Sequence, residues 1–176
     1  MKFKGNLYEQ IFFTEALKHG LEVFPPLGDY LPIDCLVMNS AGRVFKIQIK
    51  GTNRPVICER NKGLGRYKIT SCSGSNKKSP LDCTKVDILA AFIEDLQVWY
   101  LIPCMALDLA TTIGLYPHIA DSKAKHEKFK ENWNLFKINW KSFPTPCHNC
   151  TWRTISVRSY TQKSANFPNA VQLWQI

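Results

Sequence analysis

A chain of 176 residues with 45% hydrophobic and 21% charged residues has the composition of a globular domain and is long enough to bury a core. Its apolar runs, such as Val86–Phe92, fall far short of the ~20 residues that span a bilayer. The lysines near the N-terminus are followed by no apolar run of the kind that signal peptides have. We therefore expect a cytoplasmic protein with no membrane partner.

The cysteines support the same expectation. There are seven, an odd number, and Cys35, Cys58 and Cys104 lie inside apolar runs. This pattern favours buried, reduced thiols and an intracellular, reducing compartment over a disulfide framework. The pair Cys147 and Cys150 has the spacing of half a zinc site, but no second pair lies at a matching distance, so an incidental cysteine-rich turn is favoured over zinc.

The first part of the chain alternates between patterns of helix and strand. Apolar residues recur at helical spacing before Gly20, and strand-like runs follow. A three-residue link, Ser40 to Gly42, is typical of a hairpin loop with glycine in the left-handed position. The predicted elements are a helix over Gly5–His19, a strand over Leu21–Phe24, and a hairpin of Leu31–Met38 with Arg43–Lys50.

The rest of the chain predicts further strands and then helices. The predicted elements are a second hairpin of Pro55–Arg60 with Arg66–Cys72, a loop over Ser71–Pro80, a strand pair of Val86–Phe92 with Val98–Ile102, a short helix over Met105–Thr111, and a longer helix over Asp121–Phe136. Strands followed by helices favour the α/β (α+β) class, with one central mixed β-sheet flanked by helices.

The first predicted hairpin brings polar residues together. With Asn39 and Arg43 as the closing pair, antiparallel register places Asp34 opposite Gln48. Lys50 lies two residues further along, on the same face of the strand. The alternative is the solvated face of an ordinary half-buried strand.

This group of residues suits the hydrolysis of phosphodiester bonds with Mg²⁺. Asp34, the side-chain carbonyl of Gln48 and the backbone carbonyl of Ile49 are candidate metal ligands, since Mg²⁺ prefers oxygen. Lys50 would stabilise the charge that develops in the transition state. Glu9, on the first helix, would bind the metal through water or hold a second ion; an ordinary surface glutamate is the alternative.

Basic residues gather just after this hairpin. The formal net charge is +9, which favours a polyanionic partner, most often nucleic acid, over a merely basic protein. Residues 51–80 hold seven lysines and arginines and one acid, Glu59. This segment therefore carries a net charge of +6, two-thirds of the net charge of the chain. We expect the seven basic residues to bind double-stranded DNA: Arg54, Arg60, Lys62, Arg66, Lys68, Lys77 and Lys78.

At these residues the sequence resembles the PD-(D/E)XK nuclease superfamily, with Glu9 on the first helix, Asp34 at a strand and Gln48-Ile49-Lys50 on the next. The Q-x-K variant, with the later runs Lys85–Ala90 and Trp99–Pro103, most resembles the group I intron-associated homing endonucleases. The resemblance implies a restriction-endonuclease-like core over residues 1–105. Residues 106–176 lie beyond the resemblance, and we expect them to form a helical or irregular extension of the same domain. It implies a sequence-specific, Mg²⁺-dependent DNA endonuclease with Glu9, Asp34, Gln48 and Lys50 as catalytic residues.

Two other functions stay open. One is a structure-specific nuclease similar to Holliday-junction resolvases. The other is a catalytically weak DNA-binding module, because Gln48 replaces an acid. Cutting both strands of a duplex usually needs two active sites, so we expect a homo-oligomer, a dimer or a tetramer. The aromatic residues between Trp133 and Trp174 are candidates for its interface. For Asp87 the resemblance implies a role, but a turn cap or a salt bridge is favoured.

Overall fold

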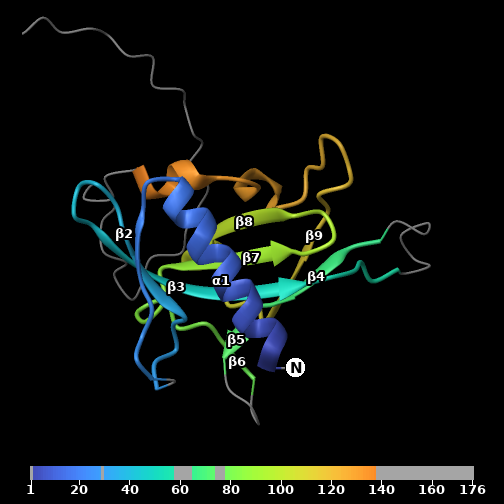
Figure 1. The fold of residues 1–176 in the computed structure, drawn as a ribbon. Helices are drawn as coiled ribbons and strands as arrows, with labels where there is room; N and C mark the ends of the chain where they lie inside the picture. Colours follow the sequence, from blue (N-terminus) through green and yellow to red (C-terminus); the bar gives the residue numbers. More distant parts are fainter. Residues whose placement is uncertain (1, 29, 58–64, 74–77, 138–176) are drawn as a thin grey trace, which may run out of the picture. The chain divides into compact units, whose positions relative to one another are not determined.

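The computed structural model describes residues 2–28, 30–57, 65–73 and 78–137 (Figure 1). Its elements are α1 (Lys2–Lys18), β1 (Glu22–Phe24), β2 (Cys35–Met38), β3 (Val44–Thr52), β4 (Tyr67–Thr70), β5 (Cys72–Ser73), β6 (Ser79–Pro80), β7 (Ile88–Ile93), β8 (Val98–Pro103) and β9 (Thr112–Leu115), with the 3₁₀ turns η2 (Cys104–Leu107), η3 (Glu127–Phe129) and η4 (Trp133–Lys137). No helix in the described part of the chain has the length and apolar character needed to cross a bilayer.

The first hairpin forms in the predicted register. β2 pairs with β3 from Cys35 opposite Ile47 to Met38 opposite Val44. Gly42 has a φ of +73°, and the side-chain oxygen of Asn39 accepts the backbone N–H of Arg43 at 2.9 Å. The loop chemistry therefore sets the register, as expected. Strand β2 is shorter than predicted, because the residues from Leu31 to Asp34 lie outside it.

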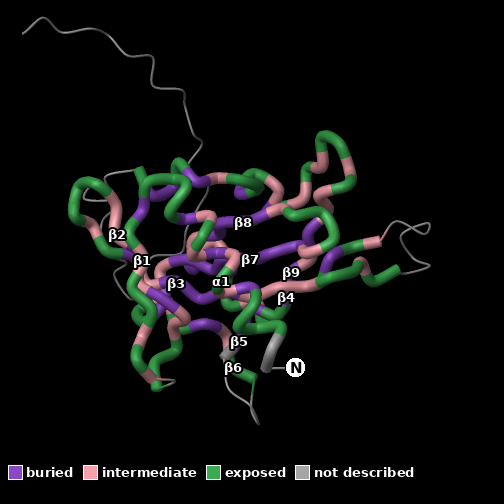
Figure 2. The backbone as a smooth tube through the Cα atoms, in the orientation of Figure 1, coloured by how far each residue is buried: buried purple, intermediate pink, exposed green. Residues whose placement is uncertain are grey.

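The central sheet is mixed, as predicted. Five strands lie in the order β1-β2-β3-β7-β8, in which β3 and β7 run parallel and every other neighbouring pair is antiparallel. All six residues of β7 are buried (Figure 2). A strand buried on both faces needs apolar residues throughout, and the sequence Ile-Leu-Ala-Ala-Phe-Ile of β7 has them.

Helix α1 covers one face of this sheet (Figure 1). Its Phe12 ring lies 5.2 Å from that of Trp99 on β8, in an edge-to-face arrangement. The Tyr8 ring lies 5.7 Å from that of Phe92 on β7. Phe12 and Ala16 are buried, as the helical spacing predicts, but Tyr8 rather than the exposed Leu7 completes the buried stripe. The helix begins at Lys2 rather than Gly5, and Gly20, with a φ of +72°, follows its end as expected.

In the described part of the chain, strands and turns cover the opposite face, and no second α-helix packs there. β4 pairs antiparallel with β9 into a two-stranded sheet. The buried side chains of this sheet, Ile69 and Ile113 among them, pack in one cluster with Leu89 and Tyr100 of the central sheet. The predicted second hairpin is corrected: β4 takes β9 as its partner, and among the described residues the two predicted strands are joined by one antiparallel bridge, between Val56 and Arg66. Residues 58–64 lie outside the described residues.

The two predicted C-terminal helices are corrected. The segment from Met105 to Thr111 forms only the 3₁₀ turn η2, which ends at Asp108 in a left-handed conformation with a φ of +48°. The long helix predicted over Asp121–Phe136 is absent; η3 and η4 stand in its place, and Asp121 and Glu131 have φ values of +54° and +49°. Such conformations interrupt a helix.

The expectation of reduced cysteines is wrong at Cys104, which forms a disulfide with Cys83. Cys83 lies shortly before β7 and Cys104 directly after β8, at the end of the pair where Ile88 is opposite Pro103. The antiparallel pairing brings the two Cα atoms to 5.5 Å. Cys35 and Cys72 are free and buried. The other cysteines, Cys58, Cys147 and Cys150, lie outside the described residues.

Candidate active site

The candidate site lies where β2 separates from β3. Asp34 directly precedes β2, and its N–H donates to the carbonyl oxygen of Ile47 at 2.8 Å. Its Oδ2 accepts the side-chain Nε2 of Gln48 and the backbone N–H of Ile49, each at 2.5 Å. Ile49 lies two residues beyond the last β2–β3 pair. The carboxylate therefore takes the place of a strand partner for the Ile49 N–H, which explains why Asp34 is held at this point.

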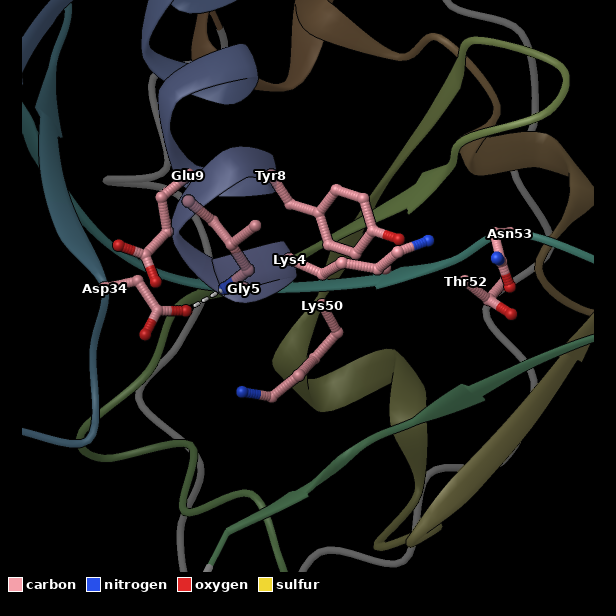
Figure 3. Close-up of a pocket in the computed structure, with 10 residues that line it drawn as sticks. Lys4, Gly5, Tyr8, Glu9, Asp34, Lys50, Thr52 and Asn53 are labelled. Carbon is pink, nitrogen blue, oxygen red and sulfur yellow. Dashed lines mark hydrogen bonds between the residues drawn. The ribbon is translucent and has the colours of Figure 1, made fainter. Parts of the chain in front are cut away.

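A pocket of about 380 Å³ opens beside Asp34 (Figure 3). It is lined by Lys4, Gly5, Tyr8, Glu9, Asp34, Ile49, Lys50, Gly51, Thr52 and Asn53. The carboxylates of Glu9 and Asp34 point toward one another, and the side chain of Lys50 extends from β3 away from α1 (Figure 3). The opening between β2 and β3 thus lets a helix residue and a strand lysine reach one space.

Glu9 and Asp34 also line a second, adjoining pocket of about 480 Å³ between α1 and the segment from Pro25 to Gly28. Their charges reach the neighbouring thiol: burial, and then the charges of Asp34 and Glu9, raise the pKa of Cys35. Both carboxylates therefore lie close enough to Cys35 to disfavour its thiolate form.

Gln48 lies behind Asp34. Gln48 is 6% exposed, and its side-chain amide nitrogen faces Asp34. It is not one of the described residues that line the pocket of Asp34 and Lys50. The structure thus brings together Glu9, Asp34, Ile49 and Lys50, while Gln48 orients the aspartate from the interior of the sheet.

The oxygen donors of this site fit a hard cation. The described residues contain no group of three or more His, Cys, Asp or Glu placed to hold a metal ion. Glu9 and Asp34 offer carboxylates, and the Ile49 carbonyl points to the same strand edge as its N–H, which is the edge occupied by Asp34. Carboxylate and carbonyl oxygens with added water are the ligands that Mg²⁺ accepts.

Tyr8 is a lining residue that the sequence did not single out. Its hydroxyl donates to Glu94 Oε2 at 2.8 Å, and Lys4 Nζ lies 3.2 Å from the same oxygen. Burial, and then the hydrogen bond to Glu94, raises the pKa of Tyr8 to about 12. A Cβ atom at Gly51 would overlap the Tyr8 ring. A glycine directly after the Q-x-K motif was the signal for this close approach.

Thr52 and Asn53 extend the same pocket beyond Lys50. The signal for Thr52 was present in the sequence, because Gln48, Lys50 and Thr52 alternate on one face of a strand.

The predicted DNA-binding residues lie partly within the described chain. Arg54, Arg66, Lys68 and Lys78 are exposed. Arg54 follows β3 closely, and Lys68 lies within β4. Arg60, Lys62 and Lys77 lie outside the described residues.

Asp87 has the structural role that was favoured for it. Its Oδ2 accepts the backbone N–H of Lys46 at 2.8 Å, and its Oδ1 lies 3.9 Å from the Lys46 ammonium. Its own N–H donates to the Lys46 carbonyl oxygen at 2.8 Å. These contacts fix the start of β7 against β3.

Comparison with known proteins agrees with this geometry. Residues 1–138 match the family described as PD-(D/E)XK endonuclease. The solved structure of a bacterial homing endonuclease, I-Ssp6803I, aligns with a TM-score of 0.63 at 24% identity, over 78% of this chain and 93% of that chain. This likeness shows a shared fold; no curated protein matches the chain. The resemblance inferred from Glu9, Asp34 and the Q-x-K motif is confirmed, and the chain belongs to the PD-(D/E)XK endonuclease family.

Proposed function

We propose that this endonuclease hydrolyses phosphodiester bonds in double-stranded DNA with Mg²⁺ as its cofactor. The observation that carries the proposal is the convergence of Glu9, Asp34 and Lys50 in one pocket, with Gln48 and Ile49 hydrogen-bonded to the aspartate. Two carboxylates and an ammonium at one opening match the needs of a metal-assisted displacement at phosphorus.

When bound, Mg²⁺ would polarise the scissile phosphate and lower the pKa of a water molecule. Asp34 and the Ile49 carbonyl would hold the ion, Glu9 would bind it through water, and Gln48 would either donate a further oxygen or orient Asp34. Lys50 places its ammonium against the phosphate, where it stabilises the negative charge that develops on the phosphate oxygens and positions the attacking water.

Gln48 favours a second candidate function. A neutral amide in place of an acid leaves the site with one negative charge fewer, and so with weaker attraction for a cation. A DNA-binding module with weak or no cleavage is therefore the alternative.

The proposed substrate is a specific sequence in duplex DNA, as in an intron homing endonuclease. The support is the fold shared with a homing endonuclease and the exposed cations Arg54, Arg66 and Lys68. We also propose a homo-oligomer, a dimer or a tetramer, since one chain brings a single site and a double-strand break needs two.

The test is a cleavage assay on a random duplex library and on a four-way junction, each with Mg²⁺ and with EDTA. Mg²⁺-dependent cleavage of a subset of duplexes supports the proposal. Preferred cleavage of the junction would favour a structure-specific nuclease. Binding with no cleavage under either condition would favour the DNA-binding module.

A further inference from the structure

The two-stranded sheet β4–β9 has a buried face and an open face. In its register Lys68 is opposite Gly114 and Thr70 is opposite Thr112. The alternate residues, such as Ile69 and Leu115, are buried in the core. Lys68, Thr70 and Thr112 are exposed. The open face is therefore polar along its length, as alternation in a half-buried strand requires.

Arg66 and Tyr116 extend this face at one end. Continuing the register places them opposite each other, directly before β4 and directly after β9. A Cβ atom added to Gly114 would lie 3.4 Å from Cδ of Arg66 and 3.6 Å from the hydroxyl of Tyr116. Both side chains thus reach across Gly114, which leaves room for them. The open face consists of Arg66, Lys68, Thr70, Thr112, Gly114 and Tyr116, and none of these six carries a negative charge.

Hydrogen bonds anchor the two-stranded sheet β4–β9 at the end where Thr70 is opposite Thr112. The backbone N–H of Ser71 donates to the Thr111 carbonyl oxygen at 2.9 Å, and the Ser71 hydroxyl donates to that of Ala110 at 2.6 Å. On the buried face, the Tyr67 hydroxyl donates to Asp95 at 2.7 Å. Side chains on such a fixed support have a defined spacing, which sequence-specific contacts need.

We propose that this open face reads base edges of the DNA substrate, with Thr70 and Thr112 as specificity-determining residues. The inference rests on the proposed function, because DNA is the substrate it assumes. The major groove admits a two-stranded β-ribbon, and threonine offers a hydroxyl for base edges and a methyl for the thymine methyl group. Arg66 and Lys68 supply the attraction for phosphates at the other end of the same face.

The position of the face suits this role. β4 lies beside β3, the strand that carries Lys50 (Figure 1). Arg54, exposed just after β3, adds a further positive charge close to the end of that strand. A duplex held on β4–β9 would therefore extend toward the pocket of Asp34 and Lys50.

The test is a binding selection from a random duplex library in EDTA, followed by sequencing. It compares the wild type with Thr70→Val/Thr112→Val, with Lys68→Ala, and with Thr14→Val, an exposed threonine of α1, as the matched control. Valine keeps the β-branched shape that suits a strand, and thermal denaturation checks that each variant folds. Omitting the metal makes the result independent of cleavage.

The wild type is expected to select a motif. In Thr70→Val/Thr112→Val, the preference for the selected base is expected to fall about 5- to 100-fold at one or two neighbouring base pairs of the motif. The salt dependence of DNA binding should be unchanged. Lys68→Ala is expected to lower affinity for all sequences and to reduce the salt slope by about one counterion. Thr14→Val is expected to select the wild-type motif.

The proposal would be overturned if the double threonine variant selected the wild-type motif unchanged, or if the wild type selected no motif. Loss of self-association in the double variant, with the motif retained, would assign the face to contacts between copies of the chain and would also overturn it. A selected motif without any Mg²⁺-dependent cleavage would instead contradict the proposed function and leave this inference standing.

Discussion

The ring of Tyr8 lies directly against the backbone of Gly51, the residue after Lys50. Tyr8 is itself followed by Glu9, so this one contact connects α1, which carries Glu9, with β3, which carries Lys50. The hydrogen bond from Tyr8 to Glu94 holds the ring in place from its other end. The spacing of Glu9 and Lys50 therefore depends on the absence of a side chain at position 51.

Gly51→Ala is expected to destabilise the protein by about 1–3 kcal/mol, because a methyl group at this position overlaps the Tyr8 ring. Cleavage should fall as well, since α1 must shift and take Glu9 with it. Thermal denaturation and a cleavage assay measure the two effects. Gly5→Ala is the control for stability, because a Cβ at Gly5 meets nothing within 4 Å and alanine favours a helix. An unchanged melting temperature in Gly51→Ala would show that the ring does not pack there.

Alkaline pH should weaken the contact between Tyr8 and Glu94. The pKa of Tyr8 is raised from 10.0 to about 12, first by burial and then by Glu94. A group with a raised pKa in the folded state contributes its full stability below the unfolded value, and loses it as pH rises through the folded one. Stability should therefore fall between about pH 10 and pH 12.

Tyr8→Phe removes this titration while it keeps the ring. Its melting temperature should fall less steeply than that of the wild type over the same pH range. Some decline should stay, because the pKa of Tyr67 is also raised to about 12, by burial and by Asp95. If the melting temperatures of the wild type and Tyr8→Phe fell in parallel with pH, the result would argue against the Tyr8–Glu94 hydrogen bond.

Local chemistry explains why the first hairpin could be predicted. The length of the loop and the glycine at position 42 determine the register, and the register places Asp34 beside Gln48 and puts Lys50 two residues further on. The candidate site therefore followed from residues close together in the sequence. For Glu9 the residues alone left a surface glutamate as the alternative, because nothing local indicates that a helical glutamate reaches the start of β2.

The errors arise where distant residues decide the structure. The segment predicted as a long helix instead supplies partners for the edge strand β8. Glu131 accepts the backbone N–H of Trp99 at 2.6 Å, and Glu127 accepts the hydroxyl of Tyr100 at 2.6 Å. Tertiary hydrogen bonds of this kind override helical periodicity. The pairing of β4 with β9, and that of Cys83 with Cys104, depends on long-range contacts in the same way.

Reduction of the disulfide should lower stability. Cys83 and Cys104 close a loop with a sequence separation of 21 residues. A crosslink of this span contributes about 3 kcal/mol through its effect on the unfolded chain. Thermal denaturation with and without a reductant measures the effect, and Cys83→Ala/Cys104→Ala should show no response to the reductant. An equal response in that variant would trace the effect to other cysteines.

Substitutions of Gln48 test its two proposed contributions, which are to orient Asp34 and to offer an oxygen to the metal ion. Gln48→Leu removes both the amide that orients Asp34 and a candidate metal oxygen, so cleavage should fall about 10- to 100-fold while DNA binding persists. Gln48→Glu places a second carboxylate beside Asp34, which should destabilise the protein in EDTA and be relieved by Mg²⁺. Melting temperatures with and without Mg²⁺ measure this relief. No response to Mg²⁺ in Gln48→Glu would place the ion away from this residue.

The most direct test of the proposed active site is the Mg²⁺-dependent cleavage rate of Asp34→Asn. Asparagine keeps the size of the side chain and an oxygen for the Ile49 N–H, but removes the negative charge that would hold the ion. Asp121→Asn is the matched control, since Asp121 is exposed and its left-handed conformation accepts asparagine. We expect DNA binding to persist in both variants, with cleavage lost only in Asp34→Asn. Cleavage by Asp34→Asn at the wild-type rate would contradict the assignment of this pocket as the active site.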